Sequence, residues 1–190
     1  MPLQAGDALI IVDVQNDFCP GGALGVPEGD QVVPVLNEWI EEAGIHGIPV
    51  FASRDWHPAG HVSFVQRGGP WPPHCLQNTA GAAFHPGLRL PWNARIISKA
   101  DTPDEDSYSA FGGTDLARRL HGEGVRRLWI GGLAQDYCVK ATALDGLREG
   151  FEVRIIVDAT RAVNVNPHDG ERALEEIRRA GAILEETPKP

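Results

Sequence analysis

The sequence predicts an α/β protein: a doubly wound, Rossmann-like three-layer sandwich in which helices cover both faces of a mainly parallel six-stranded sheet. Two patterns indicate this class. Short apolar runs rich in Ile, Val and Leu recur along the chain, and several are followed by segments whose apolar residues repeat with a helical period. The length of 190 residues suits one domain, so we expect a single domain over residues 1–190.

The expected elements alternate along the chain. Six short runs, which contain Ile, Val or Leu at the positions expected to be buried, are interpreted as strands: Ala8 to Val12, Pro49 to Ser53, Ile96 to Ser98, Arg127 to Ile130, Val153 to Val157, and Ile183 to Glu185. Four segments carry helix-period apolar residues, and several end near Gly: Gln31 to Ala43, Thr114 to Gly122, Asp136 to Arg148, and His168 to Arg179. This alternation of strands and helices is typical of a parallel sheet.

The segment from Arg54 to Trp92 departs from this alternation. It is crowded with Pro, Gly, His and Trp, and it is too long and irregular to be an ordinary connection in a compact domain. We expect it to serve a binding or catalytic site.

Charge and cysteine usage limit the function classes. The formal net charge of -9 and the lack of a dense Lys/Arg run argue against nucleic acid or an anionic membrane as partner, so we expect a small-molecule ligand. An odd number of cysteines, three, does not suggest a disulfide framework and fits a reducing compartment. The start of the chain lacks a basic segment followed by a long apolar run, which favours a cytoplasmic location.

Chemically active side chains follow four of the expected strands. They are Asp13, the pair Asp55 and His57, Lys99, and Cys138. In an open parallel sheet, ligands bind beyond the carboxyl ends of the strands, so these side chains are expected to lie near one another at a site.

Cys138 is the candidate nucleophile. A strand, a Gly131-Gly132 turn and an expected helix start precede it, so the helix dipole and unpaired amides would favour its thiolate. The backbone amides of Ala134 and Cys138 are placed to bind an oxyanion. If Asp13 and Lys99 converge on Cys138, the carboxylate can accept the thiol proton and the ammonium can stabilise the thiolate. The alternatives are a buried structural cysteine and a structural Asp13–Lys99 ion pair.

Three further residues form a candidate metal site. Asp55 and His57 stand two residues apart, hence on the same side of an extended backbone, and His74 lies in the proline-rich segment PWPPHC. Two His and one carboxylate leave open positions on a divalent metal, with zinc, iron and manganese all compatible. The sequence leaves open whether His61 is a fourth ligand or supports a ligand without binding the metal, while His85 and His168 are expected to be bystanders.

Four segments between Asp13 and Asp158 contain the residues described above: DVQNDFCPGGAL, SRDWHPAGHVSF, GGPWPPHCLQNTAGAAFHP and GLAQDYCVKATALD. Taken together, these segments resemble the nicotinamidase branch of the isochorismatase-like cysteine hydrolases. This resemblance implies hydrolysis of nicotinamide to nicotinic acid and ammonia through a cysteine thioester, in NAD salvage. It leaves open the oligomeric state and the acceptance of pyrazinamide and related amides.

The resemblance also implies residue roles. Asp13 would be the base, Lys99 its cationic partner and Cys138 the nucleophile. Asp55, His57 and His74 would hold one divalent metal, zinc first among the three. A cis peptide bond between Leu133 and Ala134 would turn the Ala134 amide toward the oxyanion. The substrate pocket is implied to contain four aromatic residues: Phe18, Trp71, Tyr108 and Tyr137.

Two other enzyme classes remain as alternatives. Another cysteine amidohydrolase of the same superfamily, acting on a carbamoyl or ureido compound, would use Asp13, Lys99 and Cys138 without needing the metal. A metal hydrolase would attack through metal-bound water and leave Cys138 structural. A non-catalytic metal-binding or ligand-binding protein would release no ammonia from any amide.

Overall fold

The fold is organised around a six-stranded sheet with strand order β3-β2-β1-β4-β5-β6 in a computed structural model that describes residues 2–188. Every pairing of these strands is parallel, which confirms the predicted α/β class. The strands are β1 (Asp7–Val12), β2 (Val50–Asp55), β3 (Arg95–Lys99), β4 (Arg127–Leu133), β5 (Glu152–Arg161) and β6 (Ile183–Glu185). The α-helices are α1 (Val32–His46), α2 (Leu116–Gly122), α3 (Lys140–Arg148) and α4 (Asp169–Arg179).

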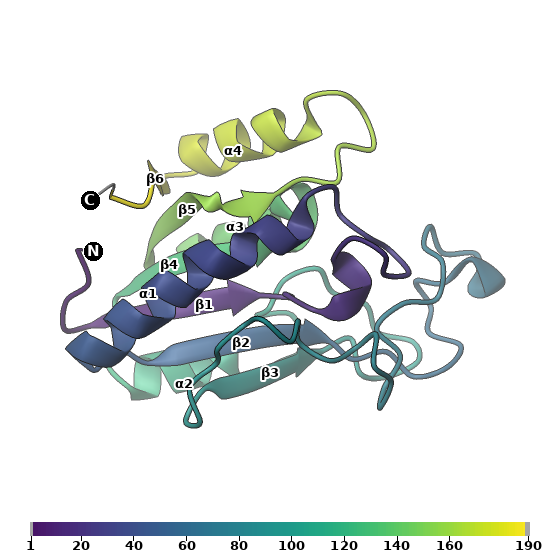
Figure 1. Cartoon of the computed structure of the whole chain (residues 1–190), viewed down its shortest axis with the longest axis horizontal. Coiled ribbons are helices and arrows are strands. Elements are labelled where there is room, and N and C mark those ends of the chain that lie inside the picture. The colour runs from purple at the N-terminus through teal and green to yellow at the C-terminus, as the bar shows by residue number, and fades with distance from the viewer. Residues whose placement is uncertain (1, 189–190) are drawn as a thin grey trace.

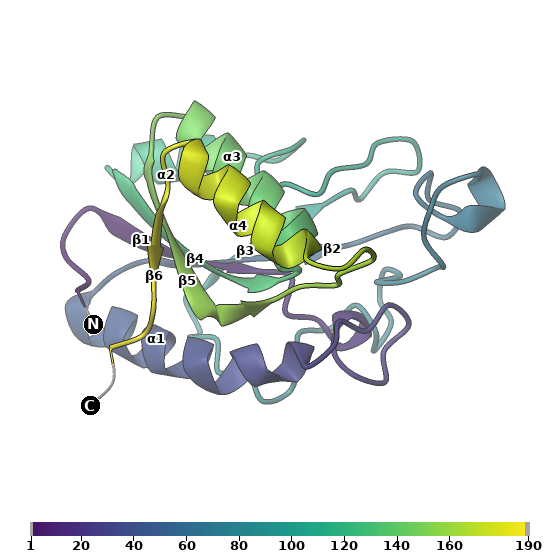
Figure 2. The ribbon, with the colours of Figure 1, turned by 90° about the horizontal axis from the view of Figure 1, so that it is seen from above.

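Helices cover both faces of the sheet (Figures 1 and 2). Helix α1 lies on one face, and α2, α3 and α4 lie on the other. On the α1 face, Trp39 packs on Trp129 of β4 with ring centroids 4.9 Å apart. On the opposite face, Leu120, Leu128 and Ile177 belong to a second buried cluster. Each helix therefore buries the apolar stripe that its sequence period predicted.

Strand β4 extends beyond its predicted end at Ile130. This strand continues through Gly131 and Gly132, which were predicted to form a turn, because both residues pair with the end of β1. Gly132 has a φ of +125°, and a Cβ built there would lie 2.1 Å from the carbonyl oxygen of Val12. Only glycine permits this close approach, so the strand reaches Leu133.

The remaining strand boundaries shift by a few residues. Asp55 and Lys99 are the last residues of β2 and β3 and do not lie beyond them. Strand β5 extends to Arg161, with an irregularity in its pairing beside Gly132. Because parallel pairing aligns these strands, the side chains at their carboxyl ends meet at one edge of the sheet.

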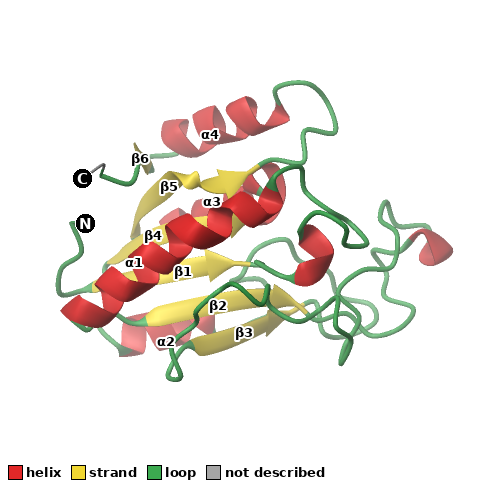
Figure 3. Ribbon diagram, viewed as in Figure 1, coloured by secondary structure: helices red, strands yellow, loops and turns green. Residues whose placement is uncertain are grey.

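Long connections gather at this carboxyl edge (Figure 3). The segment between β2 and β3, predicted to serve a site, contains only a short 3-10 turn, η3 (Val65–Arg67). Isolated bridges tie it down, including one between His57 and Leu76 and one between Phe64 and Trp71. Within residues 2–188, no helix has the length and apolar character needed to cross a membrane.

The close contact of Gly132 in β4 with Val12 in β1 should make the stability of the fold sensitive to substitution of Gly132. Gly132→Ala should lower the free energy of unfolding by at least about 2 kcal/mol more than Gly113→Ala, because only the first adds an atom against backbone. Gly113 also has a positive φ, +69°, but open space surrounds it, so it controls for backbone conformation alone. Urea unfolding of both variants gives the comparison. Equal losses would mean that the β1–β4 contact can relax.

Candidate active site

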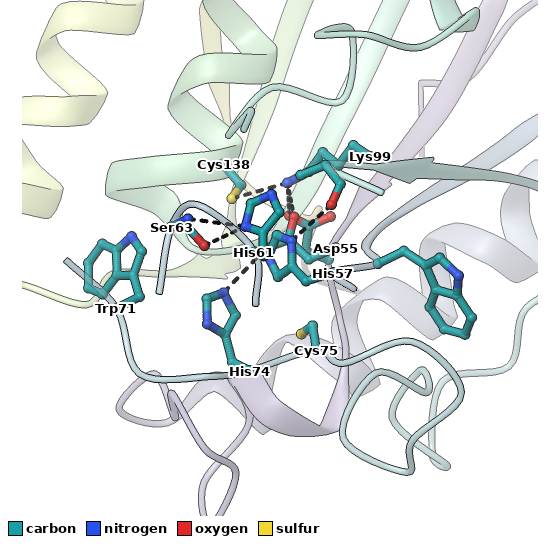
Figure 4. A network of polar contacts seen from close by, with 12 residues as sticks. Asp55, His57, His61, Ser63, Trp71, His74, Cys75, Lys99 and Cys138 are labelled. Carbon is teal, nitrogen blue, oxygen red and sulfur yellow. Dashed lines mark hydrogen bonds and ion pairs between the residues drawn. The ribbon is translucent and has the colours of Figure 1, made fainter. Parts of the chain in front are cut away.

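The ammonium group of Lys99 lies at the centre of the site (Figure 4). Its Nζ atom is 3.0 Å from Asp13 Oδ2 and 3.7 Å from Cys138 Sγ, and it contacts Asp55 Oδ1. It also donates a hydrogen bond of 3.1 Å to the backbone carbonyl of Ser107. All three side chains around Lys99 are buried. The structure thus brings together Asp13, Lys99 and Cys138, as the strand ends predicted.

Asp13 is held as a buried proton acceptor. Its φ of +49° places it in the left-handed region, where Asp is one of the more tolerant residues. Ser53 donates a 2.7 Å hydrogen bond to Oδ1, whereas Oδ2 has no hydrogen-bond partner of ordinary geometry among the described residues. Burial raises the pKa of Asp13, and Lys99 and Ser53 only partly oppose this. A carboxylate with a raised pKa is a stronger base, so Asp13 is suited to take a proton.

Cys138 lies in a π turn, η4 (Gln135–Val139), which leads directly into α3. Burial raises the pKa of its thiol well above the usual value, and Asp13 and Asp55 add to the rise while Lys99 opposes it. The sequence-based expectation that the helix start favours the thiolate is therefore wrong in direction. Full burial beside two carboxylates outweighs the effect of the nearby ammonium. The resting side chain is a thiol that needs a base.

The two other charged groups remain ionised. Burial opposes the charge of Lys99, but Asp13 and Asp55 outweigh it and raise the pKa of the ammonium well above its usual value. Burial likewise opposes the charge of Asp55, but Lys99 and the neighbouring His57 and His74 lower its pKa well below the usual range. A buried charge persists only when it is paired in this way.

Asp55, His57 and His74 present a set of donor atoms suited to a metal ion. One ligand atom from each lies within 4.8 Å of the others. Asp55 Oδ2 is 3.4 Å from His57 Nε2 and 3.7 Å from His74 Nε2. Donors bound tetrahedrally to one zinc ion at ordinary bond lengths stand roughly 3.3 Å apart. The distances between these donor atoms are therefore close to those expected if the three residues bound one ion.

The hydrogen bonds behind these rings fix their orientation. His57 Nδ1 donates to the carbonyl of Ala100 at 3.0 Å, and His74 Nδ1 donates to the carbonyl of Pro72 at 2.8 Å. A carbonyl can only accept, so Nδ1 carries the proton in each ring and Nε2 keeps its lone pair in the neutral form. Both Nε2 atoms lie beside Asp55 Oδ2, where each can bind a shared ion in place of a proton. This is the arrangement that histidine ligands of metals usually have.

A second group of potential ligands consists of Asp13, Asp55 and Cys138. The Lys99 ammonium contacts all three, so it supplies the positive charge that a metal would otherwise bring. The site therefore has two adjoining halves, one with an ammonium and a thiol and one with metal-binding donors, and Asp55 belongs to both.

A pocket opens over Cys138 and the metal-binding donors. The four predicted aromatic residues, Phe18, Trp71, Tyr108 and Tyr137, all line it. Trp71 Nε1 donates a 3.0 Å hydrogen bond to the Tyr108 hydroxyl, and Tyr137 meets the rings of both edge-on. The pocket thus presents flat apolar walls above a polar floor.

Ala134 also lines this pocket. The peptide bond between Leu133 and Ala134 is cis, as the resemblance implied. The Ala134 N–H donates no hydrogen bond to any residue in the described range. It is therefore available to a bound oxyanion.

Several residues of the site were not predicted. Ser53 and Gln15 support the acids: the Gln15 amide donates to the carbonyl of Asp55 and accepts from its N–H, both at 2.8 Å. The Gln in the DVQND segment was the only signal for this role. Further pocket-lining residues that no sequence pattern marked are Leu24, Val26, Ser63, Asp106 and Val163.

The remaining histidines lie outside the metal donor set. His85 accepts a hydrogen bond from the Gly87 amide, and His168 pairs with Glu171 in an exposed turn, so neither lines the pocket. His61 is buried beside His57 but is not one of the grouped donors.

Comparison with known proteins gives concordant results. Residues 7–188 match the isochorismatase domain. The chain is 44% identical to a nicotinamidase of Escherichia coli over 93% of each sequence. Its fold matches a zinc complex of the pyrazinamidase of Pyrococcus horikoshii with a TM-score of 0.92, 53% identity and coverage of 96% of this chain and 99% of that one. A protein of L. infantum in complex with nicotinate matches with a TM-score of 0.87 and 39% identity, over 98% and 96% of the two chains.

The charges around Cys138 predict opposite shifts of thiol reactivity in two variants. Asp13→Asn removes a negative neighbour, so the thiol pKa should fall and alkylation by iodoacetamide should begin at lower pH. Lys99→Met removes the positive neighbour, so the thiol pKa should rise and alkylation should begin at higher pH. The pH profile of Cys138 alkylation, followed by mass spectrometry, measures both shifts. If both variants had the wild-type pH profile, Asp13 and Lys99 would have no influence on the pKa of the Cys138 thiol, and the prediction would be wrong.

Proposed function

The chain belongs to the isochorismatase family, and from this membership and the geometry of its site we propose that it is an amidohydrolase that converts nicotinamide to nicotinic acid and ammonia, in NAD salvage. The observation that carries the proposal is the buried Lys99 between two carboxylates, with a thiol on one side and metal-binding donors on the other. The nicotinamidase and pyrazinamidase relatives support the same activity.

The first half of the reaction uses Cys138 and Asp13. Asp13 takes the proton of the thiol, and the sulfur forms a bond to the amide carbon. Lys99 stays protonated and stabilises the negative charge that passes from oxygen to sulfur. The carbon–nitrogen bond then breaks, Asp13 returns the proton to the leaving nitrogen, and ammonia departs. A nicotinoyl thioester remains on Cys138.

Backbone amides stabilise the tetrahedral intermediates of both halves. The free Ala134 N–H, with the Cys138 N–H, is assigned to the oxyanion. In the second half, Asp13 removes a proton from water as the water oxygen bonds to the thioester carbon. The carbon–sulfur bond breaks, the thiol regains its proton, and nicotinic acid is released.

Asp55, His57 and His74 are assigned as the ligands of one divalent metal ion. When bound, such an ion would act as a Lewis acid and provide a binding position for a ring nitrogen at the floor of the pocket. Two imidazoles and a carboxylate suit zinc, which we propose as the resident metal, and they also accommodate iron or manganese. The zinc complex of the Pyrococcus horikoshii pyrazinamidase supports this choice.

The aromatic walls are assigned to the pyridine ring. Phe18, Trp71, Tyr108 and Tyr137 offer flat surfaces on which a planar heteroaromatic amide can stack. A pyrazine ring has a similar shape and also a ring nitrogen, so we propose pyrazinamide as a second substrate. From the sequence we also propose a cytoplasmic location.

The two alternative enzyme functions explain fewer features of the site. A carbamoyl or ureido amidohydrolase would use Asp13, Lys99 and Cys138 but has no need of the oriented rings of His57 and His74. A hydrolase that attacks with metal-bound water has no need of a thiol in contact with Lys99. Only a metal-dependent cysteine amidohydrolase uses both halves.

Replacement of Cys138 tests covalent catalysis. Cys138→Ala should lower ammonia release from nicotinamide by at least about a thousandfold, because the bond-forming atom is gone while the fold and the metal donors remain. Cys19→Ala is the matched control, since Cys19 is also a buried free thiol but contacts none of the charged residues of the site. A Cys138→Ala enzyme with more than about a thousandth of wild-type activity would support attack by metal-bound water.

Removal of a metal donor tests the other half of the site. His74→Ala protein should retain less zinc after dialysis than wild type and should lose nicotinamide hydrolysis, whereas Cys138→Ala should keep its zinc. His85→Ala controls for the loss of a histidine from the same long connection. Zinc content by elemental analysis and ammonia release by a coupled assay are the measurements. Full zinc content in His74→Ala would remove this residue from the ligand set.

A further inference from the structure

His61 is a fully buried histidine that the reaction above does not use. Its ring stacks on that of His57, with centroids 4.1 Å apart and an interplanar angle of 26° (Figure 4). Despite this closeness, its nitrogens do not join the donor group of Asp55, His57 and His74. Its contacts explain why.

Both ring nitrogens of His61 are already engaged. Nδ1 accepts a hydrogen bond from the Ser63 backbone N–H at 3.2 Å and lies 2.8 Å from the Ser63 hydroxyl. Nε2 lies 2.9 Å from the backbone carbonyl of Glu105, which can only accept, so Nε2 carries the proton. His61 is therefore a neutral imidazole with no lone pair left for a metal. Burial lowers its pKa, in agreement with a neutral ring.

The stacked ring restricts the movement of His57. One face of His57 lies against His61, and the ring of Phe64 meets both histidines edge-on, at 5.5 and 5.6 Å. His57 Nδ1 is fixed to the Ala100 carbonyl at the same time. Rotation of the His57 ring would swing Nε2 away from Asp55, and the flat face of His61 opposes that rotation.

We propose that His61 is a positioning residue for the metal: it holds the ring plane of His57 by stacking, and the ion has three protein ligands. This inference rests on the proposed metal site. It decides between the two roles that the sequence left open for His61, a fourth ligand and a support for a ligand, and it names the ligand and the contact that supports it. Support for a ligand ring by a neighbour that does not touch the metal commonly changes metal affinity by about 10- to 100-fold.

Two substitutions separate the stacking face from the hydrogen bonds. His61→Phe keeps a flat ring on His57 but loses the bonds to Ser63 and Glu105, whereas His61→Leu keeps an apolar side chain of similar bulk but loses the flat face. His121→Leu is the matched control, because His121 also stacks on an aromatic ring, Phe151, at 4.5 Å, and lies outside the pocket. Zinc affinity of the metal-free proteins is measured by competition with a chromophoric chelator, alongside circular dichroism to establish that each variant is folded.

His61→Leu should bind zinc at least about tenfold more weakly than wild type, while His61→Phe and His121→Leu should stay within about threefold. X-ray absorption at the zinc edge should find two imidazole ligands in both wild type and His61→Phe. Equal zinc affinity for His61→Leu and wild type, equal weakening of the Leu and Phe variants, or loss of one imidazole in His61→Phe would each overturn the proposal. His57→Ala tests the underlying site separately: if it binds zinc as tightly as wild type, the metal assignment itself fails.

Discussion

The buried ammonium of Lys99 is the interaction on which the whole site depends. Taking a charge out of water costs several kcal/mol, and Lys99 offsets this only because two carboxylates and a backbone carbonyl surround it. Its partners come from different elements: Asp13 follows β1, Asp55 ends β2, and Cys138 follows β4. The parallel sheet brings these ends to one edge, so the fold supplies the convergence and Lys99 holds it together.

The same contacts connect the metal-binding half of the site to the thiol half. Two buried carboxylates face one ammonium, so negative charge is in excess beside Asp55, which favours the binding of a cation there. Burial raises the pKa of both Asp13 and Cys138, so each of these groups binds a proton more tightly than usual. A buried acid–base pair of this kind can pass the proton to sulfur, nitrogen and back without exchange with solvent.

The sequence predicted the arrangement of the strands and the convergence of their ends better than it predicted local chemistry. Asp13, Asp55, Lys99 and Cys138 could be grouped because the carboxyl ends of parallel strands meet. The direction of the Cys138 pKa was predicted wrongly, because it depends mainly on how deeply the thiol is buried, and the strand pattern does not give that depth. Gly131-Gly132 was interpreted as a turn because glycine pairs usually are, whereas here the missing side chain lets β4 continue against β1. The sequence also left two roles open for His61, because the bonds that engage its ring nitrogens go to Ser63 and to Glu105, the latter 44 residues away in the chain.

A thioester on Cys138 is the central claim, and rapid acid quench of the enzyme during turnover of nicotinamide tests it most directly. Acid stops hydrolysis and preserves a thioester, so digestion and mass spectrometry can examine the peptide that contains Cys138 within milliseconds of mixing. We expect that peptide to carry a nicotinoyl group that is present during turnover and absent after the substrate is exhausted. Nicotinic acid that accumulates while the peptide remains unmodified at every quench time, including the first turnover, would contradict covalent catalysis by this residue.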